Sequence, residues 1–148
     1  MFERKSHDQE KAMIHRILFV LLSAPILLLW FDMDSAKGQD ELPTLVHAVV
    51  CEDVTDRSPQ RQGVVFSVSA GKVACYTAFD PVPRRTVIYH NWYRQDELNT
   101  TIRLVLQPPR WASYSSIQLR EIDRGPWRIE IADQEGRVLH VLRFSITD

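Results

Sequence analysis

The hydrophobic pattern divides the chain into a charge-free apolar run near the N-terminus and a long region of short, alternating stretches after Leu45. In the second region, runs rich in Val, Ile, Thr and aromatic residues are separated by turn residues, a spacing typical of an all-β sandwich. The pattern predicts strands near Leu45–Asp53, Val64–Ala70, Lys72–Phe79, Thr86–Arg94, Thr100–Gln107, Ser113–Leu119, Trp127–Ala132 and Arg137–Ile146. We therefore expect a mainly β fold over residues 45–148, an immunoglobulin-like antiparallel β-sandwich.

The stretch Thr86–Arg94 is the predicted central strand, because its β-branched and aromatic residues favour extended backbone. Side chains alternate between the two faces of a strand, so one face carries Ile88, His90 and Trp92. The other face carries Val87, Tyr89, Asn91 and Tyr93. We expect Trp92 and the more distant Trp127 to be buried, since large rings in a domain of this size usually fill the core.

Several connections between the predicted strands carry turn chemistry. Gly71, between Ala70 and Lys72, predicts a tight hairpin, and the stretch Asp133–Gly136 predicts another between the last two strands. Pro108 and Pro109 cannot donate to a strand ladder, so they predict a crossing or a sheet edge.

The apolar run Ile17–Phe31 contains fifteen residues without a charge, and its apolar flanks extend it to the roughly twenty residues that span a bilayer. A cleaved signal peptide is the alternative, but a cut near Ala36 would put Asp34 where a small residue is required. A buried helix of a soluble protein is a third possibility. We favour an uncleaved transmembrane anchor over residues 17–33, in contact with the lipid bilayer through Ile17–Phe31.

The distribution of Lys and Arg around this run predicts its orientation. Four basic residues precede it, whereas only Lys37 lies between it and Leu45. Basic residues stay on the cytoplasmic side, so residues 1–16 form a predicted cytoplasmic tail and the β domain lies outside. The polar residues 34–44, which include Gly38 and Pro43, form a predicted linker.

The charge balance excludes one class of partner. The chain has 18 basic and 19 acidic side chains, a formal net charge of -1. Nucleic acid binding requires a surplus of Lys and Arg on one face, so no nucleic acid partner is expected. The five glycines are scattered and form no phosphate-binding loop, and we expect no cofactor.

Cys51 and Cys75 lie on two predicted strands of a domain that we place in an oxidising compartment. If bridged, they would close a loop whose chain entropy is worth about 3.5 kcal/mol. Two separate buried thiols are the alternative, because sequence does not show whether the two strands are neighbours. We favour a disulfide between Cys51 and Cys75.

His90 is the residue most open to a catalytic or metal-binding interpretation. No HExxH or CxxC spacing accompanies it, so we expect no metal site and interpret it as a hydrogen-bonded core residue. Ser113, Ser115 and Ser116 raise a hydrolase hypothesis, but the sequence has no G-x-S-x-G turn, and hydroxyl groups on a strand are the favoured explanation.

The aromatic residues offer the best candidates for a binding surface. Trp111 and Tyr114 lie beside Arg110 and the two prolines, at a predicted corner of the fold. We expect this pair to lie on the surface, and we take Arg110 and Tyr93 as further candidate binding residues.

Five segments resemble the bacterial envelope family known as domain of unknown function 2914. They are VVCEDVTDRSP at Val49–Pro59, VFSVSAGKVACYTAF at Val65–Phe79, HNWYRQDEL at His90–Leu98, PRWASYSS at Pro109–Ser116 and GPWRIEIADQEGRVL at Gly125–Leu139. The resemblance implies an extracytoplasmic β domain, often at the end of a chain with a membrane segment, and implies no catalytic residues. One departure is Ala112, where the family pattern commonly has an arginine.

These features together predict an anchored interaction module at a bacterial inner membrane, with its N-terminus cytoplasmic and its C-terminal domain in the periplasm. The expected partner is a membrane or envelope protein on which a non-enzymatic domain docks. The alternative is a module that binds glycan or peptidoglycan through Trp111 and Tyr114. A hydrolase is a third and weaker hypothesis.

Overall fold

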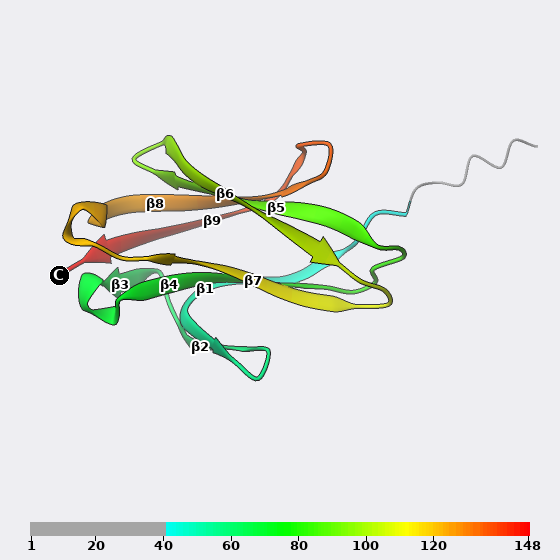
Figure 1. The fold of residues 1–148 in the computed structure, drawn as a ribbon, viewed down its shortest axis with the longest axis horizontal. Coiled ribbons are helices and arrows are strands. Elements are labelled where there is room, and N and C mark those ends of the chain that lie inside the picture. Colours follow the sequence, from blue (N-terminus) through cyan, green and yellow to red (C-terminus); the bar gives the residue numbers. More distant parts are fainter. Residues whose placement is uncertain (1–40) are drawn as a thin grey trace, which may run out of the picture. The chain divides into compact units, whose positions relative to one another are not determined.

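Nine strands form two sheets in the computed structural model, which describes residues 41–148. The strands are β1 (Leu45–Thr55), β2 (Ser58–Gln62), β3 (Val65–Ser67), β4 (Lys72–Phe79), β5 (Thr86–Arg94), β6 (Glu97–Leu106), β7 (Trp111–Gln118), β8 (Gly125–Asp133) and β9 (Val138–Thr147). Sheet A has the order β2-β1-β4-β7, and sheet B has the order β3-β9-β8-β5-β6 (Figure 1). The parallel pair β3–β9 is the exception among antiparallel pairings. The prediction of a mainly β sandwich is confirmed.

Strand β5 lies inside sheet B, between β8 and β6. Its inward side chains Ile88, His90 and Trp92 are each 0% exposed, whereas the alternate positions on the strand are only partly buried. The limits of β5 and of β4 agree with the prediction. The predicted alternation of the central strand therefore sets which of its side chains face sheet A.

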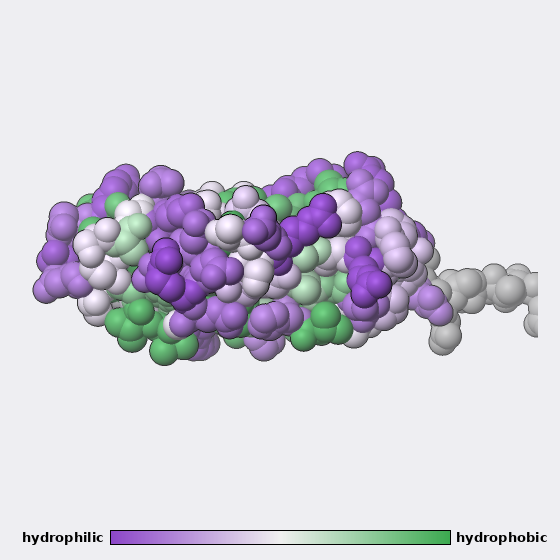
Figure 2. Space-filling model, turned by 90° about the horizontal axis from the view of Figure 1, so that it is seen from below, coloured by the Kyte–Doolittle hydropathy of each residue, from purple (hydrophilic) through white to green (hydrophobic). Residues whose placement is uncertain are grey.

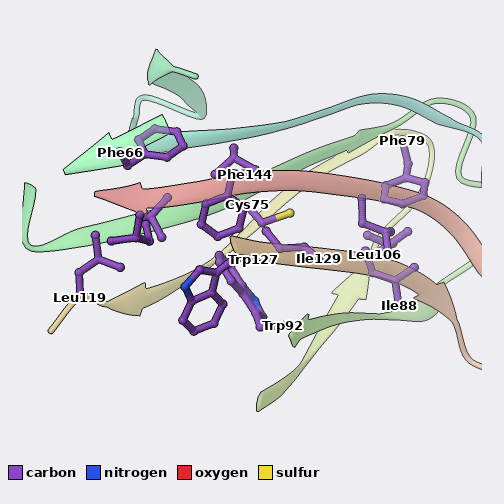
Figure 3. Packing of buried hydrophobic residues seen from close by; sticks show 14 of the residues in the cluster. Phe66, Cys75, Phe79, Ile88, Trp92, Leu106, Leu119, Trp127, Ile129 and Phe144 are labelled. Carbon is purple, nitrogen blue, oxygen red and sulfur yellow. The ribbon is translucent and has the colours of Figure 1, made fainter. Parts of the chain in front are cut away.

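Aromatic rings fill the space between the sheets (Figure 3). The ring of Phe144 stacks on Trp127 and meets Trp92 edge-on, and Phe66 meets Phe144 edge-on in turn. The Trp127 indole N–H donates to the carbonyl of Asp123 at 2.7 Å, so its polar atom is satisfied inside the core. The expectation that Trp92 and Trp127 are buried is confirmed, since they are 0% and 3% exposed.

The connections between strands partly follow the prediction. The stretch after Asp133 forms the expected β8–β9 hairpin, with Gly136 at φ 82°. Pro108 and Pro109 lie where the chain crosses from β6 in sheet B to β7 in sheet A, as expected. Both strands lie at sheet edges, where proline removes no ladder hydrogen bond.

The segment between β2 and β4 differs from the prediction. The expected strand Val64–Ala70 is limited to β3, after which Val68–Ala70 forms a turn of 3₁₀-helix. The hairpin expected at Gly71 is wrong, because β3 pairs with β9 in sheet B while β4 lies in sheet A. The chain therefore changes sheets here, and Gly71 ends the short helix at φ 76°.

The predicted disulfide between Cys51 and Cys75 is also wrong. Strands β1 and β4 are neighbours, but their register pairs Cys51 with Ala74 and Val50 with Cys75. A one-residue offset turns a side chain to the opposite face of a sheet. Both cysteines are free thiols, with Cys75 in the core between the sheets and Cys51 in a separate cluster on the other side of sheet A.

The N-terminal predictions lie outside the described residues. This holds for the tail 1–16, the anchor 17–33 with its apolar run Ile17–Phe31, and most of the linker 34–44. Within residues 41–148, no helix has the length and apolar character needed to cross a membrane.

Candidate functional site

The outer face of sheet A, which points away from sheet B, is apolar at its centre. Here Cys51, Ala74 and Tyr76 form a second buried cluster, with exposed fractions of 0%, 2% and 8%. They alternate along β1 and β4 with the residues that enter the core. Strand β4 is therefore covered on both faces, although only its inner face contacts sheet B.

A groove of about 350 Å³ lies on this face at the end of β4, which is flanked there by the start of β1 and the start of β7. Its apolar lining consists of Val46, Tyr76, Ala78, Phe79, Trp111 and Ala112. Figure 2, which looks at the molecule from below sheet A, shows white and pale green surface set between hydrophilic side chains. An apolar recess with a few polar groups around it is the usual form of a binding site.

Three charged residues complete the lining of the groove. Arg57 comes from the turn between β1 and β2, Arg110 precedes β7, and Asp80 follows β4. Asp56 and Arg57 occupy the turn at φ 51° and 59°, a left-handed pair that suits a two-residue hairpin. The hairpin projects below sheet A and carries Arg57 toward the groove (Figure 1).

The structure brings together two of the four candidate binding residues. Arg110 and Trp111 both line the groove, and Trp111 is 37% exposed. Tyr114 is 53% exposed and lies opposite Tyr76 on the outer face of sheet A, whereas Trp111 pairs with the core residue Phe79, and Tyr114 does not line the groove. Both aromatic residues of the predicted surface pair are therefore on the surface.

Tyr93 belongs to a different surface. It lies on the outer face of sheet B, where the Arg128 guanidinium sits 3.8 Å from the centre of its ring. Arg128 is held there by ion pairs with Asp96 and Glu130. Tyr93 is thus covered by its own domain and shares no site with Trp111.

His90 belongs to a chain of hydrogen bonds that links the two sheets through the core. Its Nδ1 lies 2.8 Å from Ser115 Oγ, and its Nε2 lies 3.3 Å from Thr77 Oγ1. Trp92 Nε1 donates to Ser115 Oγ at 3.1 Å, and Thr77 Oγ1 donates to the Ser113 carbonyl at 3.3 Å.

The Ser113 carbonyl at one end and a neutral His90 ring together fix the direction of the hydrogen bonds in this chain. The Trp92 indole can only donate and the Ser113 carbonyl can only accept. Ser115 therefore donates to Nδ1 of a neutral His90, whose Nε2–H donates to Thr77. Burial lowers the pKa of His90 to about 4, in keeping with this neutral ring. The interpretation of His90 as a hydrogen-bonded core residue is confirmed.

The Ser115–His90 pair has the contact distance of a nucleophile and its base, but both side chains are enclosed. His90 is 0% exposed and Ser115 is 4% exposed. The second ring nitrogen of His90 faces a threonine hydroxyl rather than a carboxylate. Ser113 and Ser116, the other serines of the hydrolase hypothesis, lie on the same strand as Ser115. The pair is therefore placed to hold the sheets together and not to meet a substrate.

Metal-binding chemistry is not assembled in the part of the chain that the structure describes. No group of three or more His, Cys, Asp or Glu side chains comes together among residues 41–148. Burial raises the pKa of both Cys51 and Cys75, so neither thiol is activated as a ligand.

Sequence reasoning missed most of the groove, namely Val46, Arg57, Tyr76, Ala78, Phe79, Asp80 and Ala112. One signal for it was present in KVACYTAF, the β4 sequence, where small or apolar residues occupy both alternating sets of positions. Such a strand is typical of a sheet covered on both faces. Ala112, the departure from the family pattern, lies in this groove.

Several solved structures match this chain, among them a fungal enzyme. A β-glucosidase from Kluyveromyces marxianus matches 69% of this chain with 12% identity and a TM-score of 0.38. This chain spans only 14% of that enzyme's chain, and at such a TM-score the likeness supports no inference. No protein with a curated description matches.

Comparison with family models gives a match that begins just before β5 and ends within β9. It includes the motifs His90–Leu98, Pro109–Ser116 and Gly125–Leu139. The motifs Val49–Pro59 and Val65–Phe79 precede it, so their part of the resemblance stays a prediction. Residues 85–146 match the family described as Protein of unknown function (DUF2914), so the resemblance to that family is confirmed over these residues.

Proposed function

We propose that the chain is a membrane-anchored, extracytoplasmic interaction module without enzymatic activity, which docks on a membrane or envelope protein through the outer face of sheet A. The observation that carries the proposal is the apolar character of this face. Val46, Trp111 and Tyr114 are 58%, 37% and 53% exposed around the buried cluster of Cys51, Ala74 and Tyr76. Apolar and aromatic residues ringed by polar ones are typical of docking surfaces.

The proposed anchor is the apolar run Ile17–Phe31, with the preceding basic residues in the cytoplasm of a bacterium and the β domain in the periplasm. Two measurements test it. The full chain should stay with vesicles during alkaline carbonate extraction, and a reporter fused after Asp148 should be active only in the periplasm. Release by carbonate or a cytosolic reporter would refute the anchoring.

The proposed architecture of the domain is immunoglobulin-like. Strands β1-β4-β7 follow the order A-B-E of that fold, and β9-β8-β5 follow the order G-F-C. Domains of this shape frequently serve in recognition, although fold alone does not assign a function.

Copurification from membranes in mild detergent tests the docking. A tagged full-length chain should retain a stoichiometric partner, and Val46→Asp combined with Tyr114→Glu should release it. Thr101→Glu, on the outer face of sheet B, is the matched control and should leave the complex intact. Equal retention by all three proteins would place the contact elsewhere.

A glycan-binding module is the second candidate function. It is favoured by the exposed rings of Trp111 and Tyr114 on one edge strand, since rings of this kind stack on sugars. In this case Trp111→Ala and Tyr114→Ala should each reduce retention of the chain on peptidoglycan or polysaccharide. Unchanged retention would exclude a glycan site at these two residues.

A further inference from the structure

The groove on sheet A combines an apolar floor with two guanidinium groups. Tyr76, Ala78 and Ala112 lie on adjacent strands β4 and β7, and Ala78 pairs directly with Ala112. Small side chains at paired positions leave a depression between larger neighbours, of which Trp111 is one. The volume of about 350 Å³ is at the lower end of ligand sites and suits one large apolar side chain with its flanking backbone.

The two arginines that line the groove are free to pair with an external anion. Neither Arg57 nor Arg110 forms an ion pair with another residue of the described region, residues 41–148. By contrast, Arg128 and Arg137 each contact two carboxylates. Asp80 is the one acidic residue in the lining, so the groove carries a net positive charge.

The position of β7 determines what shape of ligand fits. It is the edge strand of sheet A, and within the described region no further strand pairs with its open side. An extended peptide can lie along such an edge and place alternate side chains on the outer face of the sheet. A peptide with an apolar residue between acidic ones therefore matches both the floor and the arginines.

We propose that the groove binds an extended acidic peptide segment of the docking partner, whose apolar side chain rests against Tyr76, Ala78 and Trp111 while its carboxylates pair with Arg57 and Arg110. This inference rests on the proposed docking function and names the chemistry of the partner. Guanidinium and carboxylate groups form short, bidentate, charge-assisted hydrogen bonds, which give such a site its selectivity.

Fluorescence anisotropy of a labelled synthetic peptide, in which Asp alternates with Phe and Leu, tests the inference on the full-length chain in detergent micelles. The matched probe has Asn in place of every Asp. Arg57→Gly with Arg110→Gln removes both guanidinium groups, and glycine adopts the left-handed turn conformation of residue 57 without strain. Arg103→Gln, on exposed strand β6 of sheet B, is the control variant.

We expect the Asp peptide to bind. Loss of each arginine should raise the Kd of the peptide by about tenfold, the effect of losing one charge-assisted hydrogen bond. Arg103→Gln should bind like the unaltered chain, and raising salt from about 0.05 to 0.5 M should weaken binding. Equal binding of the Asn peptide, or full binding by the double variant, would overturn the inference. Binding of a uronic acid oligosaccharide with no binding of the peptide would also overturn it.

The same double variant separates this inference from the docking function. If the tagged chain retains its membrane partner despite loss of both arginines, docking stands and the acidic-peptide site fails. If Val46→Asp with Tyr114→Glu also leaves the partner bound, the contact does not use sheet A and both proposals fail.

Discussion

The two outer faces of the sandwich are built differently. On sheet B, Arg128 covers Tyr93 and forms ion pairs with Asp96 and Glu130. The Thr101 hydroxyl donates to the side-chain oxygen of Asn91 on the neighbouring strand at 2.9 Å. These side chains bind one another as a solvent-facing sheet surface usually does. On sheet A, the centre is a buried apolar cluster and the nearby arginines of the groove lack partners within residues 41–148. Under the proposed function, sheet A is the face that the partner would cover.

The largest expected difference in stability appears when a charged residue is placed on each outer face in turn. Ala74, on sheet A, is 2% exposed, so Ala74→Glu buries an unpaired carboxylate and should lower the free energy of unfolding by about 3 kcal/mol. Thr101 on sheet B is exposed, and Thr101→Glu should change it by less than about 0.5 kcal/mol. Urea denaturation of both variants measures the difference. Equal effects would mean that the two faces are equally open to solvent.

A pH titration probes the hydrogen-bond chain that joins the two sheets. Above pH 6.5 His90 is neutral in both the folded and the unfolded chain, so its contribution does not vary. As the pH falls toward 4, the unfolded chain takes up a proton that the buried ring does not, because burial lowers the folded pKa from 6.5 to about 4. The free energy of unfolding should then fall by up to about 1.4 kcal/mol per pH unit.

His90→Gln supplies the control for this titration. The variant should show little pH dependence between 6.5 and about 5, whatever its absolute stability, because Asp53 and Asp133, whose pKa values are lowered in the folded chain, begin to titrate in the unfolded chain only below that range. The same slope in the variant would assign the titration to another group.

A third comparison removes one arginine from each face. Arg128→Ala loses the contact with the Tyr93 ring and two ion pairs, so it should lower the free energy of unfolding by about 1 kcal/mol. Arg110→Ala should leave the stability within about 0.5 kcal/mol, since Arg110 is exposed and has no ion pair among the described residues. Thermal melts of the two variants test this. A larger loss for Arg110→Ala would show that Arg110 serves the fold rather than a ligand.

The smallest effect concerns the hairpin that carries Arg57. A non-glycine residue at φ 59° is strained, so Arg57→Gly should raise the free energy of unfolding by up to about 1 kcal/mol. Urea denaturation beside the unaltered chain measures it. A loss of stability would mean that the arginine side chain supports the hairpin through packing.

The sequence pattern predicted those strands whose own residues strongly favour extended backbone. Strands β4 and β5 have strong β-formers bounded by turn residues, so even their ends were predicted. Strand β2 was missed because SPQRQ has few β-formers and its turn is Asp56–Arg57 instead of the usual Asn-Gly pair. The end of the predicted strand Val64–Ala70 forms a helical turn because the chain changes sheets there.

The predictions that failed depended on register between strands, which a single sequence does not reveal. Cys51 and Cys75 lie on neighbouring strands, as a disulfide requires, but an offset of one residue sends them to opposite faces. In the same way, Arg110 and Trp111 were found as neighbours in sequence, whereas Arg57 and Val46 reach the groove only through the pairing of β1 with β2 and β4.

Site-specific photo-crosslinking in bacteria that make the full-length chain tests the central claim most directly. A photoreactive amino acid replaces Tyr114 on sheet A in one experiment and Thr101 on sheet B in the other, both of which are exposed. If sheet A is the docking face, the first chain should form a discrete crosslinked product with one membrane or envelope protein, and the second should not. A product from position 101 with none from position 114 would contradict the account.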